Sequence, residues 1–357
     1  MVIRRDFWAG KRVLVTGHTG FKGSWLTLWL RALGANVSGY ALEPPTDPAL
    51  WRQIGLESEV GSHVADVRDF PALAQVFAQM RPEVVFHLAA QSLVRPSYQD
   101  PVATYATNVM GTVHLLEAVR KTPGVRVVVN VTSDKCYENH EWTRGYREDD
   151  PMGGRDPYSS SKGCAELVTA AYRSSFFSKD ADSTALASVR AGNVIGGGDW
   201  AADRLVPDFV RATRRGLPVR IRNPKATRPW QHVLEPLYGY LSLAELLWNE
   251  GPVHAGGWNF GPADVDAVPV EKVVSTLVSL WGSPAGWAAD PGPHPHEAHY
   301  LKLDSSKSRS QLRWEPRLDL QTALAWTVEW YKGVTDDADA RTLCLKQIES
   351  YEELARQ

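Results

Sequence analysis

Short apolar runs alternate along the first half of the chain with longer segments whose apolar residues recur at helical spacing. The runs that predict strands are residues 11–16, 35–42, 60–66, 83–90 and 126–131, and the segments that predict helices are 24–33, 70–80 and 108–120. A repeated strand–helix order gives a parallel sheet with helices on both of its faces. The pattern therefore predicts an α/β fold built on a doubly wound parallel sheet of the Rossmann type.

This regular alternation ends at about residue 190. Residues 190–200 and 282–296 are rich in glycine and other loop-forming residues, and each segment predicts a loop. The pattern elsewhere predicts strands at 217–223 and 258–261 and helices at 235–248, at 268–281 and from 335 onward. The domains that we expect are a Rossmann domain over 1–189, to which 229–256 returns, and a smaller α/β substrate domain over 190–228 and 257–357.

A glycine-rich turn joins the first predicted strand to the first predicted helix. Gly17, Gly20 and Gly23 stand three residues apart, and glycine lets the backbone turn tightly and approach a phosphate at a helix N-terminus. A plain tight turn is the alternative, but the place between strand and helix favours dinucleotide binding. The ribose-binding position after the second strand is Ala41, with Glu43 two residues on, and no arginine follows to favour a 2′-phosphate. NAD is therefore the expected cofactor, with Glu43 as its ribose contact.

Tyr158 and Lys162 lie four residues apart and therefore share one face of a predicted helix. An ammonium group beside a phenol favours the phenolate, which lowers the pKa of tyrosine from its usual value of about 10. The pair thus predicts a tyrosine that acts as a base near neutral pH. The structural alternative is an aromatic ring packed on the aliphatic stem of a lysine.

Composition and charge exclude several classes of function. The net charge of −2 gives no reason to expect a nucleic acid or an anionic membrane as partner. Three widely spaced cysteines, Cys136, Cys164 and Cys344, fit neither a metal site nor a disulfide framework, and their odd number suits a reducing compartment. Neither the first residues nor any apolar run has the character of a signal peptide or a membrane span. We expect a cytoplasmic protein without a metal.

These motifs together resemble the extended short-chain dehydrogenase/reductase family, and more narrowly the nucleotide-sugar 4,6-dehydratases. The resemblance covers nearly the whole chain and rests on the glycine turn, Asp66-Val67, residues 87–90, Asn108, Ser133, Tyr158, Lys162 and residues 313–316. It implies NAD as cofactor and a homodimer formed through a helix bundle that includes the Tyr158 helix. The cofactor-binding residues that it implies are Gly17, Thr19, Gly20, Phe21, Lys22, Gly23, Glu43, Asp66, Val67, Leu88, Ala89, Ala90, Asn108, Tyr158 and Lys162.

The run Ser133-Asp134-Lys135 carries the narrower resemblance. In this family Ser133 is expected to hydrogen-bond the 4-hydroxyl group of the sugar. Asp134 favours dehydration, because the epimerases of the family generally lack an aspartate at this position. The alternative role of Asp134 is to cap a helix or turn. Lys135 departs from the Thr-Asp-Glu run of the dTDP-glucose enzymes and resembles the members that act on CDP-D-glucose, as do residues 18–26 and 228–233.

The resemblance implies an internal redox cycle. Tyr158, held as phenolate by Lys162, takes the proton of the C4 hydroxyl while hydride leaves C4. Asp134 then protonates the C6 hydroxyl, water departs, and hydride returns to C6. Lys135 is either the base that removes the C5 proton, which requires it to be neutral, or a cation that stabilises the enolate while another group removes the proton.

The substrate that the resemblance implies is CDP-D-glucose. The expected substrate-binding residues are Gln91, Ser92, Asn193, Arg204, Arg228 and His232. The two arginines are assigned to the pyrophosphate, because a guanidinium group binds phosphate oxygens in a bidentate manner. The alternatives are a dTDP- or GDP-sugar dehydratase, a nucleotide-sugar 4-epimerase, and a non-catalytic NAD-binding sensor or scaffold, a class that commonly lacks the Tyr/Lys pair.

Overall fold

A computed structural model of the chain describes residues 2–177, 183–282, 285–292 and 300–356. Its centre is a seven-stranded sheet in which all neighbouring strands are parallel, in the order β10-β6-β5-β4-β1-β2-β3. The strands are β1 (Arg12–Thr16), β2 (Asn36–Ala41), β3 (Gly61–Val64), β4 (Val84–His87), β5 (Val127–Val131), β6 (Ala185–Ala191) and β10 (Gly257–Phe260). This is the Rossmann order, so the predicted fold class is confirmed.

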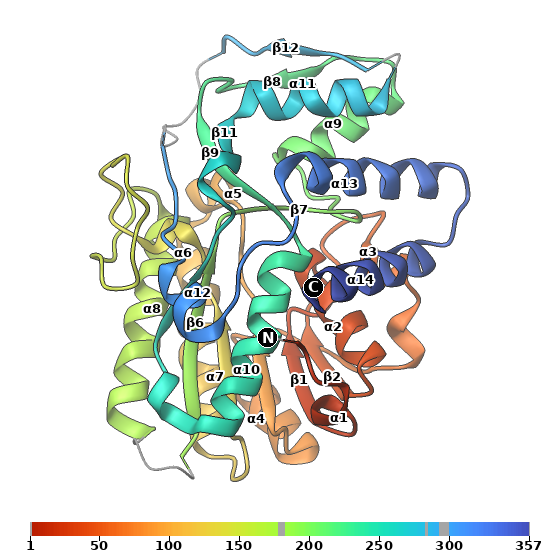
Figure 1. Cartoon of the computed structure of the whole chain (residues 1–357). Coiled ribbons are helices and arrows are strands. Elements are labelled where there is room, and N and C mark those ends of the chain that lie inside the picture. Colours follow the sequence, from red (N-terminus) through yellow and green to blue (C-terminus); the bar gives the residue numbers. More distant parts are fainter. Residues whose placement is uncertain (1, 178–182, 283–284, 293–299, 357) are drawn as a thin grey trace.

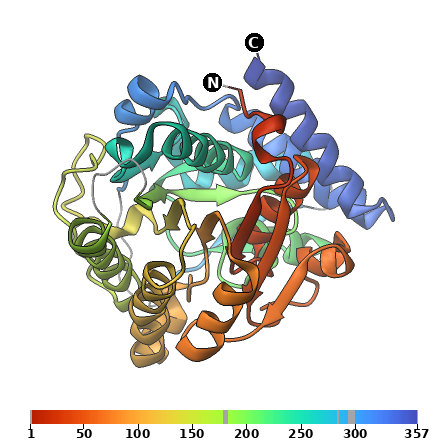
Figure 2. The same cartoon turned by 90° about the horizontal axis from the view of Figure 1, so that it is seen from below.

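Helices cover both faces of this sheet (Figures 1 and 2). One face carries α2 (Phe21–Ala32), α10 (Leu234–Glu250) and α14 (Ala340–Arg356), and the other carries α4 (Phe70–Met80), α7 (Gly111–Arg120) and α8 (Pro157–Phe176). Val13 and Val15 pack into the first layer, whereas Leu14 between them packs into the second. Because both faces are buried at the centre of the sheet, strands such as β1, β4 and β5 read as nearly continuous apolar runs, whereas the edge strand β3 is largely exposed.

The helix that carries Tyr158 begins where its sequence provides a start signal. Asp156 Oδ1 accepts a hydrogen bond of 2.9 Å from the backbone N–H of Ser159, and Pro157 occupies the first helical position. An acidic cap followed by proline is a favoured helix start. This local signal fixes where α8 begins and thereby sets the place of Tyr158 in its first turn.

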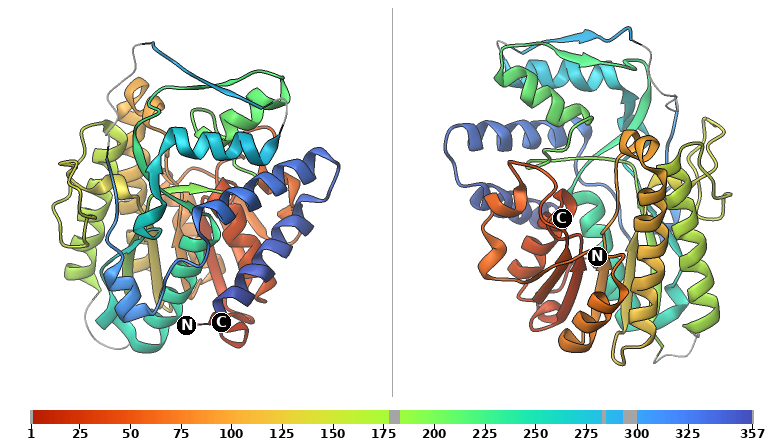
Figure 3. Two further views of the ribbon diagram at one scale, coloured as in Figure 1. Left: turned by 45° about the horizontal axis from the view of Figure 1, so that its top comes forward. Right: turned by 180° about the vertical axis from the view of Figure 1, so that it is seen from behind.

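A smaller group of elements lies at one end of the large sheet, at the top of Figure 1 and in both views of Figure 3. It contains a sheet of β7 (Asn193–Ile195), β9 (Thr227–His232) and β11 (Ala267–Pro269), a pair formed by β8 (Val219–Ile221) and β12 (Trp287–Ala289), and helices α9 (Leu205–Arg214), α11 (Val270–Trp281) and α13 (Leu320–Thr335). The other helices are α1 (Arg5–Trp8), α3 (Leu50–Gln53), α5 (Val94–Gln99), α6 (Pro101–Tyr105) and α12 (Ser306–Leu312). Within the described ranges, no helix combines the length and apolar character needed to cross a bilayer.

Several elements differ from the prediction. The expected loops contain β7 and β12, three-residue strands that are too short to show a hydrophobic period; residues 283–284 and 293–296 of the second loop lie outside the described residues. Strand β10, which we expected in the smaller domain, completes the large sheet beside β6. The C-terminal helix α14 also packs on the Rossmann part, where Trp29 Nε1 donates to Glu352 Oε1 at 2.8 Å.

Candidate active site

The glycine turn after β1 forms a tight backbone cradle. Gly17 has a φ of 74°, and a Cβ there would lie 2.7 Å from the backbone nitrogen of Ala89 at the end of β4. A Cβ on Gly23 would lie 2.1 Å from the carbonyl oxygen of Gly17, so α2 packs directly on the turn. No side chain caps the start of α2 at Gly20, which leaves its first N–H groups for an anion. The backbone therefore fits a dinucleotide pyrophosphate.

The rim of this cradle is made by the ends of β2 and β3. Thr19 Oγ1 donates to the carbonyl oxygen of Leu42 at 2.9 Å and ties the turn to β2. Glu43 is exposed beside this contact and forms an ion pair of 3.5 Å with Arg52. The carboxylate of Asp66 forms an ion pair of 2.6 Å with Arg68, which lowers the pKa of Asp66. Both predicted acidic residues are thus paired with arginines beyond the ends of β2 and β3, and their contacts with the cofactor stay a prediction.

Asn108 links the loop after β4 to the helix that carries Tyr158. It lies in a π-helical segment, Ala106–Met110, rather than at the predicted helix start. Its Oδ1 accepts from the backbone N–H of Gln91 at 2.8 Å, and its Nδ2 donates to Ser161 Oγ at 2.8 Å. The side-chain amide of Gln91 in turn donates to the carbonyl oxygen of Leu93 at 2.9 Å. Both side chains therefore order the loop that faces α8.

Tyr158 and Lys162 lie one turn apart on α8, in accord with the predicted helix, and Lys162 reaches the end of β5. Ser133 acts on the Tyr158 hydroxyl and lowers its pKa, and Lys162 Nζ donates to the carbonyl oxygen of Val131 at 3.4 Å. Burial raises the pKa of Tyr158 to about 12 and lowers the pKa of Lys162 to about 8. The lowered tyrosine pKa that the sequence predicts is therefore absent from the protein alone, because removal from water disfavours the phenolate more than its neighbours favour it.

Asp134 is 3% exposed and has two different oxygens. Oδ1 accepts from Ser133 Oγ at 2.8 Å, whereas Oδ2 has no hydrogen-bond partner within the described part of the chain. Oδ2 faces Gly192, where a Cβ would lie 3.3 Å away. Burial raises the pKa of Asp134, and the nearby charges of Lys135, Arg228 and Lys22 oppose this shift.

The alternative role of Asp134 as a cap does not apply. The side chain that caps the short helical turn at 134–136 is Ser133, whose Oγ accepts from the backbone N–H of Lys135 at 3.2 Å. Asp134 is thus a buried carboxyl group with a raised pKa and one free oxygen, which are the properties of a general acid.

Several cations lie around Asp134 and Tyr158. Arg204 donates to Asp199 Oδ2 at 2.9 Å and to Ser92 Oγ at 3.2 Å, and its charge lowers the pKa of Tyr158. Arg228 is buried and donates to the carbonyl oxygen of Thr227 at 3.0 Å. Lys22 belongs to the same group, because burial and Arg204 lower its pKa to about 8 while Asp134 raises it. The sequence assigned Lys22 only to the cofactor.

Asn193 and His232, the other predicted substrate residues, lie on neighbouring strands. Asn193 is half-buried and pairs in register with Trp230 across β7 and β9. His232 is fully buried and packs edge-on against Trp25 and Trp326, with ring centroids 6.2 and 5.8 Å apart. Burial lowers the pKa of His232 to about 3. The structure thus places His232 in the core, with its Nε2 lacking a hydrogen-bond partner among the described residues, and its assignment to substrate binding stays a prediction.

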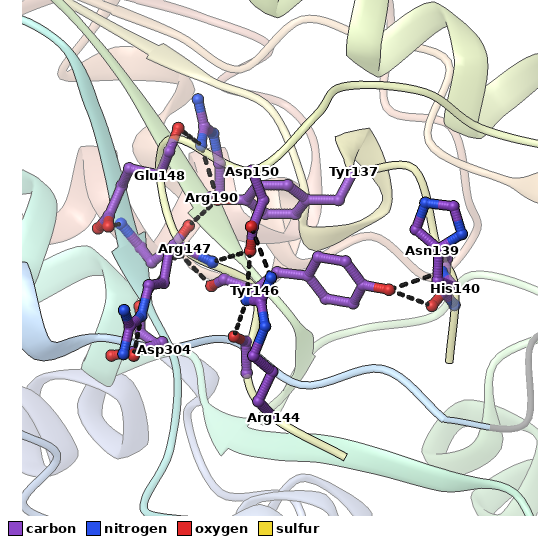
Figure 4. Close-up of polar contacts among 12 residues, drawn as sticks. Tyr137, Asn139, His140, Arg144, Tyr146, Arg147, Glu148, Asp150, Arg190 and Asp304 are labelled. Carbon is purple, nitrogen blue, oxygen red and sulfur yellow. Dashed lines mark hydrogen bonds and ion pairs between the residues drawn. The ribbon is translucent and has the colours of Figure 1, made fainter. Parts of the chain in front are cut away.

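The sequence prediction missed a buried network behind Lys162. Glu166, one turn further along α8, accepts from Ser188 Oγ at 2.6 Å and from Arg190 Nη2 at 2.8 Å. It also accepts from Thr132, the residue before Ser133. Arg190 Nη1 also donates a hydrogen bond to the hydroxyl of Tyr137 at 2.6 Å (Figure 4). The only sequence signal was an acidic residue four positions after Lys162.

The family of the chain follows from comparison with known proteins. A family model described as GDP-mannose 4,6 dehydratase matches residues 14–254. The chain belongs to this family. A CDP-glucose 4,6-dehydratase of Salmonella typhimurium is 55% identical over 98% of each chain, and a dTDP-glucose 4,6-dehydratase of Xanthomonas campestris pv. campestris is 24% identical over 89% of this chain and 92% of that one.

A solved structure of the same architecture is the UDP-glucose 4-epimerase of Thermus thermophilus in complex with NAD. It aligns with a TM-score of 0.76 and 25% identity over 90% of this chain and 99% of that one. Membership in the dehydratase family therefore coincides with a fold shared with epimerases. Within the described ranges, no group of three or more His, Cys, Asp or Glu side chains is placed to hold a metal ion.

Proposed function

We propose that this protein is a lyase that converts CDP-D-glucose to CDP-4-keto-6-deoxy-D-glucose and water. The observation that carries this proposal is the 55% identity over 98% of the chain to a CDP-glucose 4,6-dehydratase. The site supports dehydration over epimerisation, because Asp134 places a buried carboxyl group of raised pKa beside Ser133 and Tyr158. Lys135 distinguishes the site from that of the dTDP-glucose enzymes.

We propose NAD as the cofactor, held by Gly17, Gly20 and Gly23 with the free N–H groups at the start of α2. The predicted contacts of Glu43 and Asp66 with its adenosine remain part of this proposal. When bound, NAD supplies a reversible acceptor for hydride. A cofactor that returns hydride to the same substrate is regenerated in each turnover and has no need to leave.

The side chains of the site have distinct roles in this reaction. Tyr158 accepts the proton of the C4 hydroxyl, and Ser133 orients that hydroxyl. Lys162 supplies positive charge behind Tyr158 and thereby favours the phenolate. Asp134 donates a proton to the C6 hydroxyl, which leaves as water. Lys135, beside Asp134, serves at C5 either as a neutral base or as a cation that stabilises the enolate.

The substrate pyrophosphate is assigned to Arg204 and Arg228, with Asn193, Gln91 and Ser92 nearby. Both guanidinium groups already act on the catalytic side chains: Arg204 lowers the pKa of Tyr158, and Arg228 opposes the raised pKa of Asp134. An anion bound between them would therefore lie close to the reacting sugar. The smaller group of elements around β7, β8 and β9 would then contain most of the nucleotide-sugar contacts.

We also propose a cytoplasmic homodimer that acts in the biosynthesis of a deoxysugar. Large apolar side chains stand exposed on the helical layer of α8: Met110 is 47% exposed, Leu167 61% and Phe176 52%. Covering such a surface with a second copy removes apolar area from water. Light scattering on a size-exclusion column measures the mass directly; a monomer would contradict the dimer without affecting the proposed reaction.

The reaction is tested by incubating the purified protein with NAD and, separately, CDP-glucose, dTDP-glucose, UDP-glucose and GDP-mannose. Absorbance that base induces in 4-keto-6-deoxy sugars, and the loss of one water by mass, report dehydration. The proposal predicts product from CDP-glucose alone. Product from another sugar nucleotide would reject the CDP assignment, an epimer of unchanged mass would indicate an epimerase, and no turnover at all would favour a sensor or scaffold.

A further inference from the structure

Three charged side chains meet at the border between the Rossmann part and the smaller group of elements. Arg95 belongs to α5, which follows β4 of the large sheet, whereas Asp203 precedes α9 and Arg222 follows β8. Asp203 Oδ1 lies 3.1 Å from Arg95 Nη1 and 3.4 Å from Arg222 Nη1. A single carboxylate oxygen therefore joins two guanidinium groups that come from different parts of the chain.

This cluster borders the position to which the substrate pyrophosphate is assigned. Arg204 follows Asp203 directly in the chain, and its Nη2 donates to Ser92 Oγ at 3.2 Å, three residues before Arg95. Its Nη1 donates to Asp199 Oδ2 at 2.9 Å. Three arginines therefore lie beside two aspartates. The excess of positive charge favours an anion that carries more than one negative charge.

Asp203 uses only part of the hydrogen-bonding capacity of the two arginines. A guanidinium group has five N–H donors and binds a carboxylate or a phosphate best through two parallel bonds of about 2.7–2.9 Å. Arg95 and Arg222 instead share one oxygen, and Arg222 Nη2 reaches the carbonyl oxygen of Asp203 only at 3.4 Å. Within the described residues, the guanidinium group of Arg95 has no other hydrogen bond or ion pair. Donors of both arginines thus remain for phosphate oxygens.

The exposure of the three side chains allows a ligand to displace the carboxylate. The side chain of Arg95 is 39% exposed, that of Arg222 22% and that of Asp203 38%. Ion pairs between such accessible groups contribute little to stability, because water solvates both charges well. A diphosphate offers two phosphate groups and a higher charge than one carboxylate, so it competes effectively for both guanidinium groups.

We propose that Arg95, Asp203 and Arg222 form an anion clamp, in which Asp203 holds the two arginines until the diphosphate of the nucleotide sugar replaces it. This inference rests on the proposed function, which supplies the diphosphate. As the substrate binds, Arg95 and Arg222 turn from Asp203 Oδ1 to phosphate oxygens and thereby join the two parts of the chain across the ligand. The charge of Asp203 is then solvated by water. Asp203 recovers the arginines as the product leaves, so it weakens binding and assists release.

The clamp is tested by the affinity of the NAD-loaded protein for CDP, a probe that is not turned over, in titration calorimetry. Arg95→Gln and Arg222→Gln should each weaken CDP binding by about 10-fold, the usual loss for a hydrogen bond to a charged group. Asp203→Asn should instead strengthen CDP binding by about 3-fold, because the competing charge of an exposed ion pair is gone. Asparagine also tolerates the φ of 62° at this position.

Two controls separate the phosphates from other causes. Cytidine has no phosphate, so its affinity should be the same in the unmodified protein and in the three variants. Arg341→Gln removes an arginine of similar exposure, 34%, from an ion pair with Glu59, and it should leave the affinity for CDP unchanged. The opposite effects of the acidic and basic members of the clamp distinguish ligand binding from a merely structural ion pair.

Circular dichroism and NAD titration establish that the variants are folded; if Arg95→Gln is not, Arg95→Lys keeps the charge, loses the bidentate geometry and should still weaken CDP binding. Unchanged affinity for CDP in both arginine variants would overturn the clamp. So would weaker CDP binding in Asp203→Asn, which would make Asp203 a ligand of the substrate. Absence of dehydrated product from CDP-glucose with the unmodified protein would instead overturn the proposed function, while the effects on CDP affinity would still support the clamp. The two failures are therefore distinguishable.

Discussion

Glu166 Oε2 and Arg190 Nη2 lie 2.8 Å apart in the protein interior, one turn of α8 beyond Lys162. Both side chains are 4% exposed. Removing one partner of a buried ion pair destabilises a folded protein by about 3–5 kcal/mol, because the other charge is left buried without compensation. The pair therefore fixes α8 against β6 directly behind the catalytic side chains. The charge of Glu166 also raises the pKa of Lys162.

Replacing Glu166 should change the pH dependence of the reaction. Burial lowers the pKa of Lys162 to about 8, and Glu166 opposes this shift. In Glu166→Gln the pKa of Lys162 should fall further, so the alkaline loss of kcat should move to lower pH, because protonated Lys162 is needed. A pH–rate profile of single-turnover rates measures the shift. Thr132→Val removes a hydrogen bond to Glu166 but keeps its charge, and its alkaline limb should stay in place.

Asp134→Asn should separate the two halves of the reaction. The amide cannot donate an acidic proton to the C6 hydroxyl, so water loss should slow by about 10²- to 10⁴-fold. Oxidation at C4 should continue, because Tyr158, Ser133 and Lys162 are unchanged, and reduced nicotinamide should accumulate in rapid-scanning absorbance. Dehydration at the unmodified rate would show that another group is the acid.

Two glycine substitutions should distinguish packing from cofactor binding. In Gly23→Ala the new Cβ would lie 2.1 Å from the carbonyl oxygen of Gly17, so the variant should lose stability as well as NAD affinity. In Gly20→Ala the nearest contact is 3.4 Å and φ is −80°, so stability should change little. NAD affinity should still fall in Gly20→Ala if the pyrophosphate lies against this backbone. Thermal unfolding and NAD titration measure the two effects; unchanged affinity in both variants would contradict the cradle.

Local sequence patterns predicted the Rossmann sheet well, for identifiable physical reasons. Strands such as β1 and β5 are buried on both faces, and α8 has an Asp-Pro start, so short-range signals suffice. The three-residue strands β7 and β12 carry no period, and the place of β10 in the large sheet depends on contact with β6, which is distant in sequence.

Sequence patterns could predict the site residues that belong to local motifs. They could not predict the contacts between residues that are distant in sequence. Tyr158 and Lys162 share a helix face, so their spacing revealed them. The pKa of Tyr158, however, depends on burial, which the spacing does not show. Likewise, Arg190 lies 24 positions from Glu166, and the burial of His232 depends on Trp25 and Trp326, which are distant in sequence.

Glu235 should make folding stability depend on pH. This carboxyl group is fully buried, and burial raises its pKa from 4.5 to about 7. The neutral form is therefore favoured in the folded state, and its contribution is complete below the unfolded pKa and lost as pH rises through about 7. Glu235→Gln removes this dependence. Relative to the unmodified protein, its unfolding free energy should gain about 3 kcal/mol between about pH 5 and about pH 9. A pH-independent difference in denaturant unfolding would contradict this account.

In the proposed reaction the hydride removed from C4 returns to C6 of the same sugar. The most direct measurement uses CDP-D-glucose labelled with deuterium at C4, incubated with the protein and NAD in ordinary water, with the product analysed by NMR and mass spectrometry. We expect a 4-keto product that carries the deuterium in its C6 methyl group. Deuterium lost from the product, or retained at C4 of a sugar that has not lost water, would contradict it.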